Sequence, residues 1–122
     1  MTTVLDASAI LAYLQGEEGA ELVETHLAAD TTCAAVNWSE VAQKVRAAGR
    51  DWDLVSALLH SYRVIVEPVN IDDAEWAARR WQPGEGLSLA DRLCLALGER
   101  LDAPILTADT TWGAEGHIRQ IR

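Results

Sequence analysis

Short apolar runs alternate along this chain with longer segments in which apolar residues recur every three or four positions. The short runs contain β-branched residues and predict strands at residues 3–5, 32–36, 64–66, 104–107 and 118–121. The longer segments predict helices at residues 8–14 and 17–28, and four more that run to about residues 48, 62, 81 and 100. We expect these four to be capped by Asn37, Asp51, Asp72 and Ser88. This alternation predicts an α/β fold in which helices cover both faces of a parallel sheet.

Two acidic residues follow predicted strands. Asp6 ends the first strand, and Asp109 lies just beyond the fourth. Because ligands bind at the carboxyl ends of the strands in such sheets, both are candidate site residues. Each also has a structural interpretation, since Asp6 could cap the following helix and Asp109 could be an ordinary turn residue.

Two further acids lie in the first turns of predicted helices. Glu40 follows Asn37 by three residues and Asp91 follows Ser88 by three, which is the spacing of a capping box. Lys44, four residues after Glu40, also allows a surface ion pair. Both helices nonetheless start near strand ends, so four acids could converge on one rim of the sheet.

The charge balance adds an argument about metal binding. The chain has 122 residues, which predicts a single domain over residues 1–122, and its formal net charge is −9. Such an acidic surface repels nucleic acid at long range. Gathered carboxylates also repel one another, and a hard divalent cation such as Mg²⁺ relieves that repulsion and can attract a phosphate.

Composition also bears on the compartment. Two cysteines, Cys33 and Cys94, make neither a disulfide framework nor a four-ligand zinc site, so we expect buried thiols. No apolar run is long enough to span a bilayer, and Asp6 interrupts the first one before it could form a leader. We therefore expect a cytoplasmic protein without membrane contact.

The acids lie in four motifs: VLDASA at residues 4–9, SEV at 39–41, LSLADRL at 87–93 and ILTADTTW at 105–112. Their order, spacing and context resemble those of PIN-domain ribonucleases, specifically the VapC-type toxins of toxin–antitoxin pairs. The similarity extends over nearly the whole chain.

This resemblance implies a three-layer α/β/α sandwich with strand order 3-2-1-4-5. It implies an endoribonuclease that depends on Mg²⁺ or Mn²⁺ and cleaves RNA phosphodiester bonds with a metal-activated water, leaving 5′-phosphate ends. Carried over by position, the metal ligands are Asp6, Glu40, Asp91 and Asp109; Thr107 matches a hydroxyl residue that orients them, and Ser8 matches a polar position beside the first acid. The implied partners are a cognate antitoxin, an RNA substrate and a second copy of the chain in a homodimer.

Basic and aromatic residues offer further contacts to RNA. Lys44, Arg46 and Arg50 could hold the backbone, as could Arg92 beside Asp91, although a solvated surface position is the alternative for each. The five tryptophans could stack unpaired bases, but packing in the core or an interface is the commoner role. They are Trp38, Trp52, Trp76, Trp81 and Trp112.

Other classes fit less well. A haloacid-dehalogenase-like phosphatase needs a second Asp two residues after the first, where this chain has Ser8. A response-regulator receiver needs an Asp after the third strand and a late lysine, whereas Val66 is followed by Glu67 and the only lysine is Lys44. A PIN-like scaffold that binds protein without catalysis is the remaining alternative.

Overall fold

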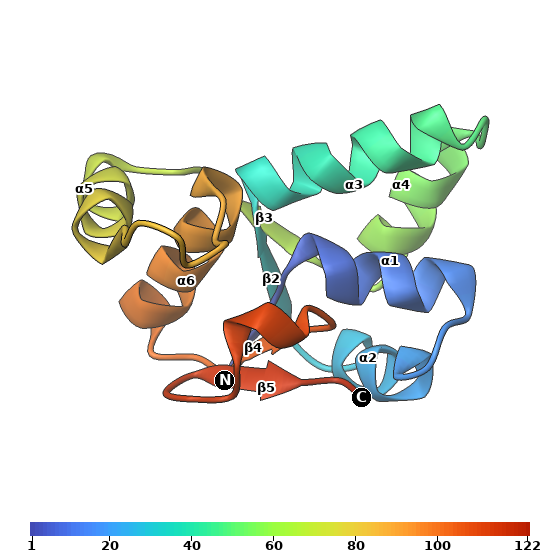
Figure 1. Ribbon diagram of the computed structural model, residues 1–122. Helices are drawn as coiled ribbons and strands as arrows, with labels where there is room; N and C mark the ends of the chain where they lie inside the picture. Colours follow the sequence, from blue (N-terminus) through green and yellow to red (C-terminus); the bar gives the residue numbers. More distant parts are fainter.

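The computed structural model describes residues 1–122 and is built on one five-stranded parallel sheet (Figure 1). Its strands are β1 (Thr3–Leu5), β2 (Thr31–Ala34), β3 (Ile65–Glu67), β4 (Ile105–Thr107) and β5 (Ile118–Gln120). All neighbouring pairs are parallel and the order is β3-β2-β1-β4-β5, which confirms the expected topology. The central strand, β1, therefore lies between β2 and β4, whose residues are far away in the sequence.

Helices cover both faces of the sheet, as Figure 1 shows. They are α1 (Ala7–Gln15), α2 (Ala20–Leu27), α3 (Ala35–Ala47), α4 (Trp52–Ser61), α5 (Ile71–Arg80) and α6 (Leu89–Leu101), with a short 3₁₀ helix η1 (Thr110–Trp112). Successive strand residues enter opposite cores: Leu5 packs with α1 to α4, whereas Val4 packs with α6. This alternation explains why the central strands β1, β2 and β4 are buried along their whole length, and the helices on both faces confirm the three-layer α/β/α sandwich.

One close approach fixes α6 against the sheet. Gly98 lies on the buried face of α6, where a methyl group in place of its hydrogen would overlap the Cδ1 atom of Ile105. A glycine lowers helix propensity, but here it lets the helix backbone pack directly on β4. The packing brings the start of α6, which carries Asp91, to the same side of the sheet as the end of β4.

Two of the four predicted helix caps are confirmed and two are wrong. Asp51 caps α4 and Ser88 forms a capping box with Asp91. Asn37 does not cap α3, because that helix begins two residues earlier, directly after β2, and has no side-chain cap. Asp72 does not cap α5 either.

Asn70 caps α5, and Asp73 completes a capping box with it. Asp73 is 4 % exposed and also accepts hydrogen bonds from Arg100 of α6, with Nε to Oδ1 at 3.0 Å and Nη2 to Oδ2 at 3.2 Å. The two helices are thus held together by a paired carboxylate and guanidinium.

Two expectations from composition can be compared with the fold. Both cysteines are buried free thiols, and burial raises the pKa of each well above its ordinary value. None of the helices has the length and apolar character that crossing a bilayer requires.

Candidate active site

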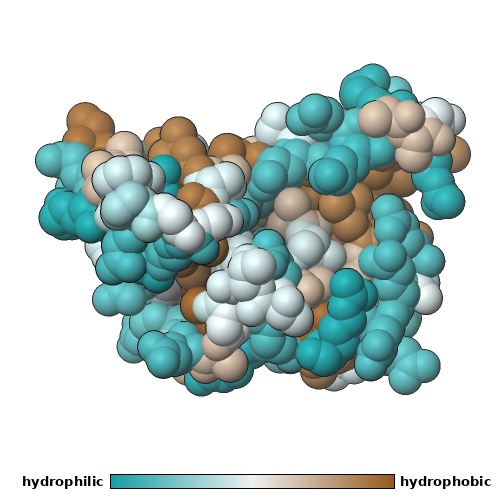
Figure 2. Space-filling model, in the orientation of Figure 1, coloured by the Kyte–Doolittle hydropathy of each residue, from teal (hydrophilic) through white to brown (hydrophobic).

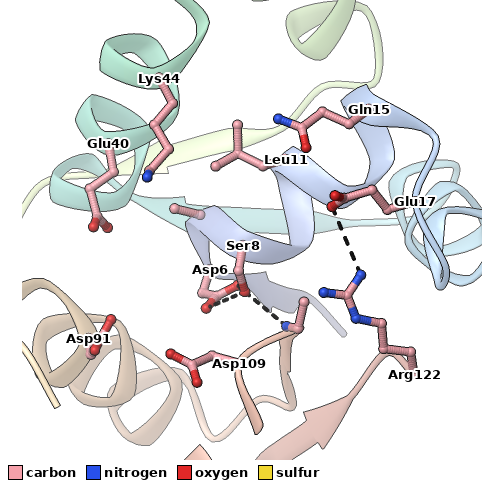
Figure 3. A pocket seen from close by; sticks show the side chains of 12 residues that line it. Asp6, Ser8, Leu11, Gln15, Glu17, Glu40, Lys44, Asp91, Asp109 and Arg122 are labelled. Atoms are coloured by element: carbon pink, nitrogen blue, oxygen red, sulfur yellow. Dashed lines mark hydrogen bonds and ion pairs between the residues drawn. The ribbon is translucent and has the colours of Figure 1, made fainter. Parts of the chain in front are cut away.

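A pocket of about 450 Å³ opens at the carboxyl ends of β1 and β4. The four predicted acids, Asp6, Glu40, Asp91 and Asp109, all line it (Figure 3). They come from the end of β1, the middle of α3, the first turn of α6 and the end of β4. The topology therefore assembles residues that span more than 100 positions of the chain. The expected placement after a strand or in a first helical turn is correct for Asp6, Asp91 and Asp109, but Glu40 lies in the middle of α3, because that helix begins at Ala35.

Asp6 is the most buried of the four, with 4 % of its surface exposed. Its Oδ1 accepts a hydrogen bond from the backbone N–H of Ala9 at 2.8 Å, so it caps α1 as well as lining the pocket. The Ser8 hydroxyl lies 2.8 and 2.9 Å from the two carboxylate oxygens, and the Thr107 hydroxyl donates to Oδ2 at 2.8 Å. Every partner is uncharged, and no lysine or arginine forms an ion pair with this buried carboxylate.

This environment raises the pKa of Asp6 from 3.8 to about 6. Burial is the main cause, because a carboxylate loses its hydration in the interior. The hydrogen bonds from Ala9, Ser8 and Thr107 lower the pKa in part, and repulsion from Asp91 raises it again. A cation bound beside Asp6 would compensate the ionised carboxylate for its lost hydration and for the repulsion from Asp91.

Ser8 and Thr107 join the ends of the two strands. Thr107 is fully buried, and its Oγ1 accepts a hydrogen bond from the backbone N–H of Asp109 at 3.0 Å while donating to Asp6. The Ser8 Oγ accepts from the backbone N–H of Ala108 at 2.9 Å. The predicted orienting role of Thr107 therefore has a geometric basis, since its hydroxyl touches both acid-bearing segments.

Asp91 and Asp109 each serve a local structural purpose as well. Asp91 accepts from the backbone N–H of Ser88 at 3.0 Å. Asp109 accepts from the backbone N–H and the hydroxyl of Thr111, at 2.9 and 2.6 Å, and caps η1. In both cases the structural interpretation and the site interpretation hold together, because capping fixes a side chain at the rim without removing it from the pocket.

Glu40 has a buried neighbour that the sequence interpretation missed. The side chain of Asn37 donates from Nδ2 to Glu40 Oε1 at 2.9 Å and to the carbonyl oxygen of Ala90 at 3.3 Å. The spacing of three residues between Asn37 and Glu40 predicts a capping box, in which each side chain would bond the helix backbone. In the structure the two side chains bond each other. Lys44 forms no ion pair with Glu40, although both line the pocket.

The basic residues around the pocket differ from those expected. Lys44 lines it as predicted, and Arg122, the last residue, lines the opposite side and lies 3.9 Å from Glu17 (Figure 3). Arg92 points elsewhere, because its Nη1 donates to the carbonyl oxygen of Ala77 at 2.7 Å. Arg46 and Arg50 do not line the pocket, although Arg50 borders a neighbouring groove.

None of the five tryptophans lines the pocket. Trp112, the last residue of η1, is buried in the core. Trp38 packs edge-to-face on Trp52 with ring centroids 5.3 Å apart. Most of them therefore take the packing role, and Trp81 is the exposed exception at 57 %.

Comparison with known proteins agrees with this architecture. The family model for the PIN domain matches residues 3–114. The chain belongs to the PIN-domain family. No curated protein sequence matches it.

Solved structures with the same fold come from toxin–antitoxin systems. A toxin–antitoxin complex from Klebsiella pneumoniae contains a chain with a TM-score of 0.77 and 16% identity, over 98% of both chains. A chain of DNA-bound VapBC from Salmonella typhimurium has a TM-score of 0.72 and 12% identity, over 100% of this chain and 99% of that chain. A chain of VapBC2 from Rickettsia felis, bound to a promoter DNA fragment, has a TM-score of 0.70 and 11% identity, over 98% of both chains. At these identities the likeness shows a shared fold.

The donors in the PIN-domain pocket suit a hard divalent cation, because carboxylate oxygens are the ligands that Mg²⁺ prefers. The buried Asp6, which has no cationic partner of its own, is the strongest sign of fit. No three acidic, histidine or cysteine side chains of the chain are already grouped closely enough to hold one ion. Holding an ion at this site would require at least one acid to turn farther into the pocket.

Proposed function

We propose that this PIN-domain protein is a metal-dependent endoribonuclease and the toxin of a toxin–antitoxin pair. The observation that carries the proposal is that three acids from separate elements line the same pocket as Asp6, a buried carboxylate without a cation. Acids recruited only as helix caps would have no reason to share one pocket. The family match and the fold shared with chains of toxin–antitoxin complexes support the same proposal.

In this proposal Asp6, Asp91, Asp109 and Glu40 hold Mg²⁺, with Mn²⁺ as a substitute. When bound, the ion lowers the pKa of water for attack on the RNA phosphodiester and neutralises charge on the leaving oxygen. Ser8 and Thr107 keep the Asp6 carboxylate fixed through their hydroxyl hydrogen bonds. Hydrolysis by water needs no attack by the RNA 2′-hydroxyl, so 5′-phosphate and 3′-hydroxyl ends are expected.

Two cations offset the acidic surface near the pocket. Lys44 forms no ion pair, and Arg122 has only a distant ion pair with Glu17 at 3.9 Å and a hydrogen bond from Nη1 to the carbonyl oxygen of Glu18 at 3.3 Å. Figure 3 shows Lys44 beside Glu40 and Arg122 across the pocket from it, so the two cations are placed to contact different phosphates of a bound strand. The net charge of −9 is thus compatible with RNA binding that is local to the pocket.

The antitoxin is proposed to bind over the same region. An apolar groove of about 190 Å³ adjoins the pocket and shares Leu11, Gln15 and Lys44 with it. Leu14, Leu58 and their neighbours give the groove an apolar lining, and Figure 2 shows hydrophobic side chains exposed in this part of the surface. A homodimer remains a prediction, which light scattering of the purified protein would check.

The test is cleavage of a mixed RNA pool by the purified protein with Mn²⁺ or Mg²⁺, and again with chelator. We expect the native protein with metal to cut RNA and leave 5′-phosphate ends. Asp6→Asn, prepared in parallel, is expected to reduce the rate by more than about 100-fold, because it alters a metal ligand and not a supporting residue. Asp72→Asn is the matched control, since Asp72 is exposed and outside the pocket.

Equal cleavage by the native protein and Asp6→Asn would identify a contaminating nuclease and contradict the proposal. Absence of cleavage, together with absence of any Mn²⁺ effect on the melting temperature, would favour the binding scaffold instead.

A further inference from the structure

Asn37 is a buried polar residue whose position the fold itself does not require. It is the third residue of α3 and 1 % exposed, yet its side chain accepts no hydrogen bond from the helix backbone. Its Oδ1 is buried without any donor. A buried acceptor without a partner is unfavourable, so an apolar residue of similar size would serve packing equally well.

The donor half of the same amide makes two contacts, and both lead to the acid pocket. Nδ2 donates to Glu40 Oε1 at 2.9 Å, one turn along α3. It also donates to the carbonyl oxygen of Ala90 at 3.3 Å, directly before Asp91 in the first turn of α6. One amide therefore links the two helices that carry Glu40 and Asp91.

The contact with Glu40 leaves that carboxylate half occupied. Oε1 accepts from Asn37, whereas Oε2 makes no hydrogen bond within the chain. Figure 3 shows the Glu40 carboxylate directed toward the side of the pocket where Asp91 lies. An oxygen that is fixed by its neighbour but unpaired itself is suited to bind a cation, because the side chain has already lost its rotational freedom.

We propose that Asn37 is a positioning residue of the pocket, which orients Glu40 and sets the separation of α3 and α6 for the bound divalent cation. This inference rests on the proposed function. It adds a residue outside the four acids, and it gives the buried Asn37 amide, whose Oδ1 has no donor, a purpose that core packing does not give it.

The test compares Mn²⁺ binding by the native protein, Asn37→Leu, Glu40→Gln and the double variant, by calorimetric titration without RNA. Asn37→Leu removes the amide with little loss of volume, and Glu40→Gln keeps an acceptor for Asn37. We expect each single substitution to raise the Mn²⁺ dissociation constant by about tenfold. If Asn37 acts through Glu40, the double variant will bind no more than about twofold more weakly than Glu40→Gln alone.

A second readout separates positioning from folding. Asn37→Leu is expected to keep its melting temperature in chelator and to recover RNA cleavage at saturating Mn²⁺. Asn70→Ala is the matched control, because this other asparagine caps the distant α5 and its loss lowers stability without touching the pocket. Asn37→Ser serves as the second variant if the leucine disturbs folding.

The outcomes are distinguishable. An unchanged dissociation constant in Asn37→Leu, or a double variant whose loss is the product of the two single losses, overturns the role of Asn37 while leaving the nuclease proposal intact. A native protein that neither binds Mn²⁺ nor cleaves RNA overturns the proposed function, and this inference with it.

Discussion

Two buried aspartates show how differently one molecule can accommodate the same side chain. Asp6 and Asp73 are each 4 % exposed and each lies at the start of a helix. Asp73 is paired with Arg100, and its neighbourhood raises the pKa of the Arg100 guanidinium, chiefly through their hydrogen bonds. Asp6 has only hydroxyl and amide partners, and its own pKa rises to about 6. Both carboxylates help to cap a helix, but the Asp73 carboxylate has its cation within the chain, whereas the Asp6 carboxylate has none.

The largest effect that would sharpen this contrast is a pH dependence. The pKa of Asp6 is about 6 in the fold and 3.8 in the unfolded chain, so the folded state binds the proton more tightly. Stability of the metal-free protein should therefore fall as pH rises from about 4 to 7, by about 3 kcal/mol from this group. Urea unfolding in chelator should show that the free energy of unfolding of Asp6→Asn rises relative to that of the native protein as pH increases over this range.

Mn²⁺ should abolish the relative gain of Asp6→Asn, since the ion favours the ionised carboxylate. A difference between the two proteins that stays constant from pH 4 to 7 would contradict the assignment of the shift to Asp6.

Loss of the other aspartate should destabilise without affecting the pocket. Asp73→Ala removes a cap and leaves Arg100 without its closest partner, but the arginine side chain is 30% exposed and can be solvated. We expect a loss of about 2 kcal/mol, below the range for a fully buried pair. Urea unfolding measures it, and the Mn²⁺ response of the folded protein should remain. Loss of that response would mean that the two regions are coupled.

Added metal should stabilise the region around Asp6 and do so through the acids. At a Mn²⁺ concentration ten times the dissociation constant, mass action contributes about 1.4 kcal/mol, a shift of a few degrees in melting temperature. Asp91→Asn should reduce the shift, whereas Asp102→Asn, at the far end of α6, should not. A shift of equal size in both variants would place the ion elsewhere.

The smallest expected effect concerns the hydroxyl beneath Asp6. Thr107→Val keeps the buried volume but removes the donor to Asp6 and the acceptor for Asp109 N–H. We expect a stability loss of about 1 kcal/mol and a further rise in the pKa of Asp6, because a hydrogen bond that lowers it is lost. The fall in stability with pH should therefore occur at higher pH in Thr107→Val than in the native protein. The exposed control Thr110→Val should show no such shift.

The sequence predicted the strands and the positions of Asp6, Asp91 and Asp109 well, because these depend on local pattern, whereas Glu40 lies in the middle of α3 and not in its first turn. The order of the strands came from family resemblance, since short apolar runs such as Thr3–Leu5 do not encode their neighbours. The caps at Asn37 and Asp72 were wrong for a tertiary reason: α3 continues directly from β2, and α5 starts where Asn70 and Asp73 can bond each other.

Three neighbours of the pocket illustrate what sequence adjacency cannot supply. Arg92 follows Asp91, but one residue along a helix turns the side chain toward α5. Arg122 is distant in sequence, yet β5 brings it to the pocket. Asn37 was read as a cap, and only the burial of its amide beside Ala90 reveals the link to α6.

The place of β1 in the sheet also governs when the site can exist during synthesis. The contact between Asp6 and Thr107 joins residues 101 positions apart. A nascent chain in which Asp6 has been made but β4 has not lacks the strand that completes the surroundings of Asp6, and such long-range pairing forms late. The pocket that Asp6 and Asp109 line therefore cannot assemble until β4 has left the ribosome, so its formation is one of the late events of folding during synthesis.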